Sequence, residues 1–535
     1  MDSPRDSAPS SSPVARIAYK AVYAIAIAFI VFKILEYRHF NFGYTILPHF
    51  SPPAHDRAVS KLKATTHYVF PPRSGYDGQY YAQLALEPQA TGPEIERALD
   101  NYLYRARRIL FSWTAAAFGL GNPNWTLQAY CVQNALFWLL TAFLLMRWLP
   151  PNNWQNAIRF LCCLFTVGLV NSFDRALLDG PSLFLIALGA ASLEAGRTWL
   201  GTAILGISGL GKETNLLACS GLWKPDQRNQ SILQISLATL PFVAWFTYLL
   251  ASSSQNPTTS LGGSNFSFPL VGFFAAALGV LKEAGDTGFP ARSFLKFAML
   301  AALFAQCLYF FVRPKPERVW WRIGLSFAIL MLFLGDAVWA NVEAAPRALL
   351  PMTIAFNLLF SRKAIWLPIL LFANILSIAG LARLEPTYVP ERYDMQGASH
   401  LAFDPETNQF SALEFGEGWY ANEGGAKRFW RWSNGDGSTG FRVPGDRRIR
   451  AILTFLPRAL GEREIQLEVN GENLWTYQCP NGYGENQRIE LILESGDNAL
   501  RIHSPQPPLR AGQDPRDLSF AVYNYKLELV EVVQD

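Results

Sequence analysis

The chain has 535 residues, of which 50% are hydrophobic, 14% aromatic and only 16% charged, whereas about 25% of the residues of an ordinary soluble domain are charged. This composition indicates a membrane protein. The last third of the chain is more polar, which predicts a second domain that lies in water and not in lipid. The formal net charge of +4 is small and spread along the chain, which gives no support to nucleic-acid binding.

The N-terminal segment combines a polar tail with an apolar run. Residues 1–16 are rich in Ser and Pro, so we expect a disordered cytoplasmic tail. The run from Ile17 to Leu35 is long enough for a bilayer crossing of about 20 residues. Because Glu36-Tyr37-Arg38-His39 follows it without a small-residue cleavage site, we predict a retained transmembrane helix and not a signal peptide.

Further apolar segments have the length that a bilayer requires. They cover residues 126–149, 156–173, 180–196, 198–223, 231–251, 293–312, 319–336, 345–361 and 364–383. Two doubtful segments, 109–120 and 266–281, are shorter or amphipathic, and we expect them to be helices at the outer surface. Segment 198–223 is predicted to be two short halves broken at Gly209-Leu210-Gly211-Lys212-Glu213, which gives about 11 crossings in an α-helical bundle.

The basic residues of the short loops set the orientation, because cytoplasmic loops collect Lys and Arg. With the N-terminus inside, they all fall on one side: Arg147, Arg159, Arg197, Lys224, Arg228, Arg313, Lys315, Arg318, Arg322, Arg362 and Lys363. The long loop 38–125, the loop NSFDRALLDGP, the segment WANVEAAPRALLP and the polar last third then lie outside. We therefore expect a multi-pass membrane protein with its N-terminus inside, whose ionisable residues gather at the outer face.

Several of these ionisable residues can be explained either by a role in the fold or by a role in function. Asp77-Gly78 is typical of a tight turn, since glycine accepts positive φ and aspartate bonds the local backbone. Lys212 and Glu213 form either a mutual ion pair or, for Lys212, an anion partner at a helix break. Asp179 is a candidate helix cap before Pro181.

Other residues on the outer side also have both a structural and a functional explanation. Asp174 and Arg175 are expected to pair at the membrane interface. Tyr76, Tyr80 and Tyr81 are either interfacial anchors or stacking surfaces for sugar rings.

Three motifs in this order resemble the membrane glycosyltransferases of the GT-C superfamily. YDGQYYAQLALEP is similar to the first-loop Asp motif of bacterial members, DRALLDGPSLFL to the Arg-x-Leu-Leu-Asp loop of protein mannosyltransferase-like members, and LGKET to their Lys-containing helix break. The resemblance covers residues 17–385. It implies a GT-C-like fold in a bacterial cytoplasmic (inner) membrane. It also implies a polyprenyl-phosphate-linked sugar as donor, with a glycan, lipid or protein as acceptor.

The chemistry of an inverting transfer fits the residues at these motifs. One carboxylate takes the proton of the acceptor hydroxyl, and cations stabilise the departing phosphate. We expect Asp77 to be the base and Lys212, Arg347, Arg105 and Arg108 to bind donor phosphate. Expected sugar or acceptor contacts are Tyr76, Gln79, Tyr80, Tyr81, Asp174, Arg175, Asp179 and Glu213.

No cofactor is required by this interpretation. Many members of the superfamily carry two adjacent acidic residues in the first loop, whereas Gly78 follows Asp77 here, so a metal site is not favoured. Two other classes remain open. A transporter or flippase of lipid-linked glycans would show repeats between the two halves of the bundle, and none is found. A noncatalytic membrane scaffold would have no need of Asp77.

The last third, residues 395–535, is predicted to be an all-β sandwich. RRIRAILTFLP, REIQLEVNGE, NQRIELILESGDNALRIHS and LSFAVYNYKLELVEVV alternate apolar and polar residues between turn signals. GEGWYANEGGAKRFWRWSNGDG resembles the start of the jelly-roll, carbohydrate-binding-like modules attached to bacterial membrane glycosyltransferases. Trp419, Trp430 and Trp432 are either sugar platforms or, as is more usual in a sandwich, part of its core.

Overall fold

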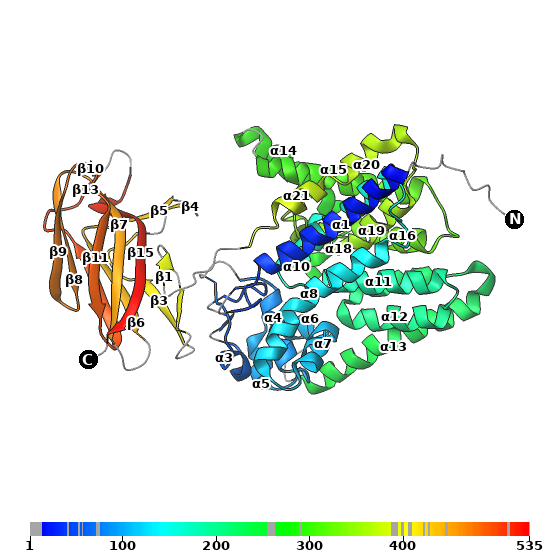
Figure 1. Ribbon diagram of the computed structural model, residues 1–535, viewed down its shortest axis with the longest axis horizontal. Helices are drawn as coiled ribbons and strands as arrows, with labels where there is room; N and C mark the ends of the chain where they lie inside the picture. Colours follow the sequence, from blue (N-terminus) through cyan, green and yellow to red (C-terminus); the bar gives the residue numbers. More distant parts are fainter. Residues whose placement is uncertain are drawn as a thin grey trace.

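A computed structural model shows a helical part that ends at Ala382 and a β part that begins at Asp394 (Figure 1). It describes residues 13–533 except 40–41, 52–53, 56, 71–74, 254–262, 288–290, 387–393, 397–400, 405–408, 421–422, 426–427, 444–447 and 511–513. Most of the predicted disordered tail, residues 1–12, lies outside the described residues. Pro13–Arg16, which we expected to belong to that tail, forms the first turn of helix α1.

The helical part consists of long bundle helices and shorter helices in the segment between α1 and α8. The bundle helices are α1 (Pro13–Glu36), α8 (Pro123–Leu145), α9 (Trp154–Leu164), α10 (Val167–Asp174), α11 (Asp179–Glu194), α12 (Thr198–Gly211), η1 (Glu213–Leu222), α13 (Arg228–Ser252), α15 (Ala291–Val312), α16 (Val319–Leu332), α19 (Leu350–Leu359), α20 (Leu367–Ala373) and α21 (Leu376–Ala382). The shorter ones are α3 (Ser60–Lys63), α4 (Gly78–Leu86), α5 (Pro93–Ala98), α6 (Tyr102–Ala106) and α7 (Leu110–Gly119).

Among the described residues, four helices are long and apolar enough to cross a membrane: Val14–Glu36, Pro123–Leu145, Pro225–Ser252 and Ser293–Val312. Two bent pairs, 154–174 and 364–382, raise this number to six if each pair is one span. The remaining predicted spans are short. Helix α12 has 14 residues, a length of about 21 Å against a hydrocarbon core of about 30 Å, so the count of about 11 crossings stays a prediction.

The two doubtful segments are helical. Helix α7 covers the first, and α14 (Val271–Thr287) covers most of the second. On α14, Phe273 packs against Phe304 and Trp339 with ring centroids 5.5 Å apart, while Phe274 and Leu278 on the opposite face are more than half exposed. Whether α7 and α14 lie at the outer surface stays a prediction.

The predicted break in segment 198–223 is present. Helix α12 ends at Gly211, Lys212 is extended, and the 3₁₀-helix η1 begins at Glu213 and packs back against α12. Glycine is required at the end of α12, because a Cβ at Gly211 would lie 2.6 Å from the Phe111 ring. The two halves form a hairpin with Lys212 at its tip.

Side-chain contacts join neighbouring loops at each end of the bundle. At one end, Trp148 donates to Glu194 Oε2 (2.6 Å) and Gln155 to the carbonyl oxygen of Arg362 (2.6 Å). At the other end, Arg383 pairs with Glu343 (2.8 Å) next to the start of α18 (Ala344–Ala348). Each of these contacts joins two loops that we expect on the same side of the membrane, and the orientation itself stays a prediction.

Among the described residues, the β part contains two large antiparallel sheets and a pair of short antiparallel strands, β13 (Leu509–Arg510) and β14 (Asp517–Leu518). The first has the order β10-β7-β15-β5-β4, with β11 paired to β7 and β1 to β15, and the second has the order β2-β3-β6-β12-β8-β9. Their strands are β1 (Asp394–Gln396), β2 (Leu401–Asp404), β3 (Gln409–Phe415), β4 (Glu423–Gly425), β5 (Arg428–Trp432), β6 (Asp436–Val443), β7 (Arg448–Ala459), β8 (Arg463–Val469), β9 (Glu472–Cys479), β10 (Gly482–Tyr483), β11 (Gln487–Leu493), β12 (Gly496–His503) and β15 (Phe520–Val533).

The sheets share an apolar core, as the alternation predicts. Buried and exposed residues alternate along β11 and β12, and Leu453, Leu467 and Phe520 are fully buried in one cluster. Trp432 is 7% exposed in a second cluster, where half-buried Trp430 stacks on Tyr523 with ring centroids 5.1 Å apart. Both tryptophans pack against protein atoms, in agreement with the core interpretation; sugar binding by the sandwich stays a prediction.

Candidate active site

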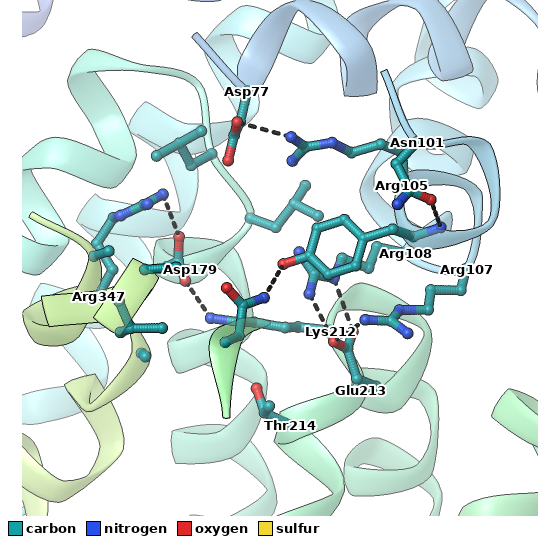
Figure 2. A pocket seen from close by; sticks show the side chains of 18 of the residues that line it. Asp77, Asn101, Arg105, Arg107, Arg108, Asp179, Lys212, Glu213, Thr214 and Arg347 are labelled. Carbon is teal, nitrogen blue, oxygen red and sulfur yellow. Dashed lines mark hydrogen bonds and ion pairs between the residues drawn. The ribbon is translucent and has the colours of Figure 1, made fainter. Parts of the chain in front are cut away.

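A cavity of about 410 Å³ lies at the end of the bundle where α11 begins and α12 ends (Figure 2). Segments far apart in the sequence form its walls: the start of α4, helix α6, the hairpin tip at Lys212, and α18. Eight of the predicted site residues line it: Asp77, Tyr81, Arg105, Arg108, Asp179, Lys212, Glu213 and Arg347. The sequence therefore indicated part of the polar lining of one cavity.

Asp77 occupies the residue before helix α4 but makes no capping hydrogen bond. Its carboxylate instead accepts a hydrogen bond from Arg105 Nη2 at 2.9 Å, and its side chain is 39% exposed to the cavity. Burial opposes its ionisation, but the guanidinium groups of Arg105, Arg347 and Arg108 together outweigh burial and hold the pKa of Asp77 below its ordinary value. A carboxylate that stays ionised at neutral pH thus faces the cavity.

The glycine after Asp77 has a different role from the one that the turn interpretation assigned. Gly78 is the first residue of α4, and a Cβ there would collide with the backbone carbonyl of Arg175. The Asp-Gly pair is therefore required by close packing of two backbone segments, and the prediction of a positive-φ turn is wrong. This contact fixes the start of α4, and with it Asp77, against the loop before α11.

Asp179 holds two cations at the opposite wall. Its Oδ1 accepts from Lys212 Nζ at 2.6 Å and its Oδ2 from Arg347 at 3.4 Å, as Figure 2 shows. Helix α11 begins at Asp179 itself, and the side chain makes no cap hydrogen bond. The capping role that we predicted for Asp179 is therefore wrong, because the charge of this carboxylate is used to bring Lys212 and Arg347 together.

Glu213 lies in a separate cluster below Tyr104. It accepts hydrogen bonds from Arg107 at 2.7 Å and from Arg108 at 2.6 and 2.8 Å. The Tyr104 ring covers both guanidinium groups, with its centroid 4.7 and 4.2 Å from their central carbons. The predicted mutual pair of Lys212 and Glu213 does not form, because successive side chains of extended backbone point to opposite sides.

The remaining predicted contacts lie outside the residues that line the cavity. Asp174 pairs with Arg175 at 3.1 Å, as expected, and Gln79 is buried with its side-chain oxygen bound to Ser51. Tyr80 lies under the Arg105 guanidinium, 5.0 Å from its central carbon.

Tyr76 lies directly behind the cavity. Its ring lies between the guanidinium groups of Arg175 and Arg347, 5.5 and 5.6 Å away, and its hydroxyl donates to Glu343 at 3.0 Å. Burial raises the pKa of Tyr76 to about 12. This residue therefore supports the site from behind. Tyr81 does line the cavity, but it is 2% exposed and its hydroxyl accepts from Arg108, so its ring is not a stacking surface.

Sequence reasoning missed several lining residues, namely Asp100, Asn101, Tyr104, Arg107, Thr214 and Asn265. A signal was present for two of them, since Tyr104 and Arg107 belong to the same YRARRILF segment as Arg105 and Arg108. Asn265 donates to the Tyr104 hydroxyl at 3.3 Å from a segment 161 residues away along the chain, which no local pattern indicates.

Part of the cavity wall is apolar. Leu330 at the end of α16, Leu334, and Val338 on α17 (Asp336–Trp339) line it together with Phe266, which is 53% exposed. Charged and apolar walls thus meet in one cavity. Among the described residues, no group of three or more His, Cys, Asp or Glu side chains is arranged to hold a metal ion.

Comparisons with known proteins do not assign the chain to a family. No family model and no curated protein matches the chain. The arabinosyltransferase EmbB from Mycobacterium smegmatis is 10% identical over 98% of this chain, which spans 66% of that protein's length, with a TM-score of 0.31.

Two solved carbohydrate-binding modules are similar to a smaller part of the chain. A family 35 module from Clostridium thermocellum is 17% identical over 22% of this chain and 86% of its own length, with a TM-score of 0.15. The CBM35 module from Paenibacillus barcinonensis is 12% identical over 24% of this chain and 97% of its own length, with a TM-score of 0.13. These TM-scores are too low to assign a fold or an activity, so the function is argued from the site.

Proposed function

We propose that the chain is a membrane glycosyltransferase that transfers a sugar from a polyprenyl-phosphate-sugar donor to an acceptor outside the cytoplasm. The observation that carries this proposal is the composition of the cavity. Asp77, a half-exposed carboxylate, faces the same space as the Lys212 and Arg347 cations, and an apolar wall closes that space on another side.

Lys212 and Arg347 are the cations best placed to receive the donor phosphate. Arg347 makes one weak contact of 3.4 Å with Asp179, and its buried Nε has no hydrogen-bond partner among the described residues. Lys212 has three donor hydrogens, and among the described residues its ammonium group bonds to the Asp179 carboxylate. An incoming phosphate can accept from both side chains without breaking another ion pair.

Arg105 and Arg108 are less suited to the phosphate-binding role that we expected of them. Arg108 makes two hydrogen bonds to Glu213, and Arg105 is bound by Asp77 and Asp100. Each of these guanidinium groups also donates to the Tyr81 hydroxyl, so most of its N–H groups are already bonded and few remain for a phosphate. We propose that both arginines instead fix the geometry of the carboxylates around the cavity.

The proposed reaction assigns one step to each group. The acceptor oxygen bonds to the anomeric carbon while the bond from that carbon to the phosphate oxygen breaks, and polyprenyl phosphate leaves with the bonding electrons. Asp77 takes the acceptor proton as the new bond forms. A carboxylate of low pKa is sufficient, since the hydroxyl becomes strongly acidic once its oxygen is bonded to an oxocarbenium-like carbon.

The apolar wall supports a lipid-linked donor over a water-soluble one. Leu330, Leu334 and Val338 give an isoprenoid chain an apolar surface beside the phosphate-binding cations. A soluble sugar nucleotide would leave this wall facing its polar parts.

The test is transfer by the purified full-length chain in lipid nanodiscs. Radiolabelled polyprenyl-phosphate mannose and polyprenyl-phosphate arabinofuranose serve as donors, with a panel of octyl glycosides as acceptors. We expect labelled product from the wild type and a loss of about 10²–10⁴-fold in D77N. The matched control is E87Q, since Glu87 pairs with Lys61 in the same outer segment but does not line the cavity.

Three results would contradict the proposal. Equal rates of transfer by D77N and the wild type would show that Asp77 is not the base. Absence of transfer by the wild type would favour a noncatalytic scaffold. Movement of intact lipid-linked sugar across the bilayer, without transfer, would favour the flippase class.

A further inference from the structure

Asp100 is a second carboxylate beside Asp77, although 23 residues separate them in the sequence. It lies between helices α5 and α6, and it accepts hydrogen bonds from Arg105 Nε at 2.9 Å and Nη2 at 2.8 Å. The same Nη2 donates to Asp77 Oδ1 at 2.9 Å. One nitrogen atom thus bridges both carboxylates, which makes them immediate neighbours on the cavity wall.

The exposure of the three side chains shows which of them face a ligand. Arg105 is 7% exposed, whereas Asp77 is 39% and Asp100 is 38% exposed. The guanidinium therefore lies beneath the two carboxylates and neutralises part of their mutual repulsion. A carboxylate offers about four acceptor positions, and hydrogen bonds from described residues occupy one on Asp77 and three on Asp100.

Paired carboxylates with unused acceptor positions are suited to a ligand that carries two hydroxyl donors. Neighbouring hydroxyls of a sugar ring are close enough to donate one hydrogen bond to each carboxylate. A lone hydroxyl, such as that of a serine side chain, would leave one of the two carboxylates without a donor from the ligand.

We infer that Asp100 binds the acceptor hydroxyl next to the one that Asp77 deprotonates. This inference rests on the proposed function. The acceptor is then a saccharide or another polyol with neighbouring hydroxyls. Asp100 acts in recognition of the acceptor and Asp77 in the chemical step. Asp100 also supplies, from the loop between α5 and α6, the second acidic group that is absent from the position after Asp77.

The test combines a substitution with a matched pair of acceptors in the same nanodisc assay. The variant is D100N. The acceptors are an octyl hexopyranoside that the wild type uses and its monodeoxy analogues, each lacking one ring hydroxyl. We expect D100N to raise the KM for the parent acceptor about tenfold to hundredfold, as loss of a hydrogen bond to a charged group predicts, with a smaller change in kcat.

One deoxy analogue should respond differently. For the analogue that lacks the hydroxyl bound by Asp100, D100N should change the KM less than about twofold, since the interaction is already absent. A general weakening of the fold or a displaced Arg105 would affect both acceptors alike, so the comparison separates recognition from structural damage.

The outcomes distinguish the inference from the function on which it rests. Equal losses on the parent and on every deoxy analogue would mean that Asp100 only braces Arg105, which overturns the inference and leaves the transferase intact. Transfer to none of the acceptors by the wild type and by E87Q would overturn the proposed function itself.

Discussion

Lys212 and Asp179, 33 residues apart in the sequence, form an ion pair of 2.6 Å between Nζ and Oδ1, while Oδ2 of the same carboxylate reaches Arg347 at 3.4 Å. These side chains are 16%, 8% and 13% exposed. Removing one partner from a buried ion pair leaves an uncompensated charge and usually costs about 3–5 kcal/mol.

We expect D179N to lower the free energy of unfolding by roughly 3 kcal/mol and to raise the KM for the lipid-linked donor, because Lys212 and Arg347 lose the group that holds them together. Thermal unfolding and donor titrations in nanodiscs measure the two effects. In the double variant D179N/K212Q the stability loss should be smaller than the sum of the single losses. Strictly additive losses would show that the pair is not coupled.

The pH dependence of transfer follows from the lowered pKa of Asp77. Because this pKa is lower in the folded protein than in the unfolded chain, ionised Asp77 contributes stability above its ordinary pKa of about 3.9 and loses it as the pH falls through the folded value. Wild-type kcat/KM should therefore show no acid limb from Asp77 until the pH is below about 4.

The variant R105Q should move this acid limb to higher pH. Burial then acts on Asp77 without its nearest opposing cation, so the pKa of the carboxyl rises. A pH–rate profile of the wild type, R105Q and K61Q measures the shift; Lys61 pairs with Glu87 outside the cavity and serves as the control. Identical profiles for all three proteins would argue against Asp77 as the base.

Gly78 gives a steric prediction. In G78A the new Cβ meets the backbone carbonyl of Arg175, and overpacking of this kind costs about 1–3 kcal/mol. Transfer should fall as well, since the start of α4 that carries Asp77 must move. The control is G279A, because a Cβ at Gly279 in helix α14 meets nothing within 4 Å. Equal stability and activity of the two variants would contradict the packing role of Gly78.

The sandwich provides a test of its aromatic clusters. Trp432 is 7% exposed and Tyr483 is 46% exposed, so W432A should cost about 3–5 kcal/mol. Y483A should cost less, about 1 kcal/mol, because it loses only edge contacts with Tyr523 and Arg458. Maleimide labelling of Cys479, which is fully buried in the sandwich core, reports unfolding of this domain in the full-length chain. Faster labelling of Y483A than of W432A would contradict the placement of Trp432 in the core and of Tyr483 at the surface.

Local patterns in the sequence were sufficient to predict several of the helices and strands. The apolar run at residues 17–35 predicted α1, alternation predicted strands such as β11 and β12, and Gly211 with Lys212 predicted the helix break. Each signal acts over a few neighbouring residues, because burial repeats with the period of the helix or strand. The loop charges in turn placed Asp77, Asp179, Lys212 and Arg347 on one side, and the structure brings them to one cavity.

The choice of partners was decided only by the tertiary structure. Lys212 pairs with Asp179 and not with its neighbour Glu213, because extended backbone turns adjacent side chains apart. Asp100 meets Asp77 through Arg105 because the loop between α5 and α6 packs against the start of α4. Such contacts depend on how helices rotate and approach one another in three dimensions, and no periodicity along the chain records that geometry.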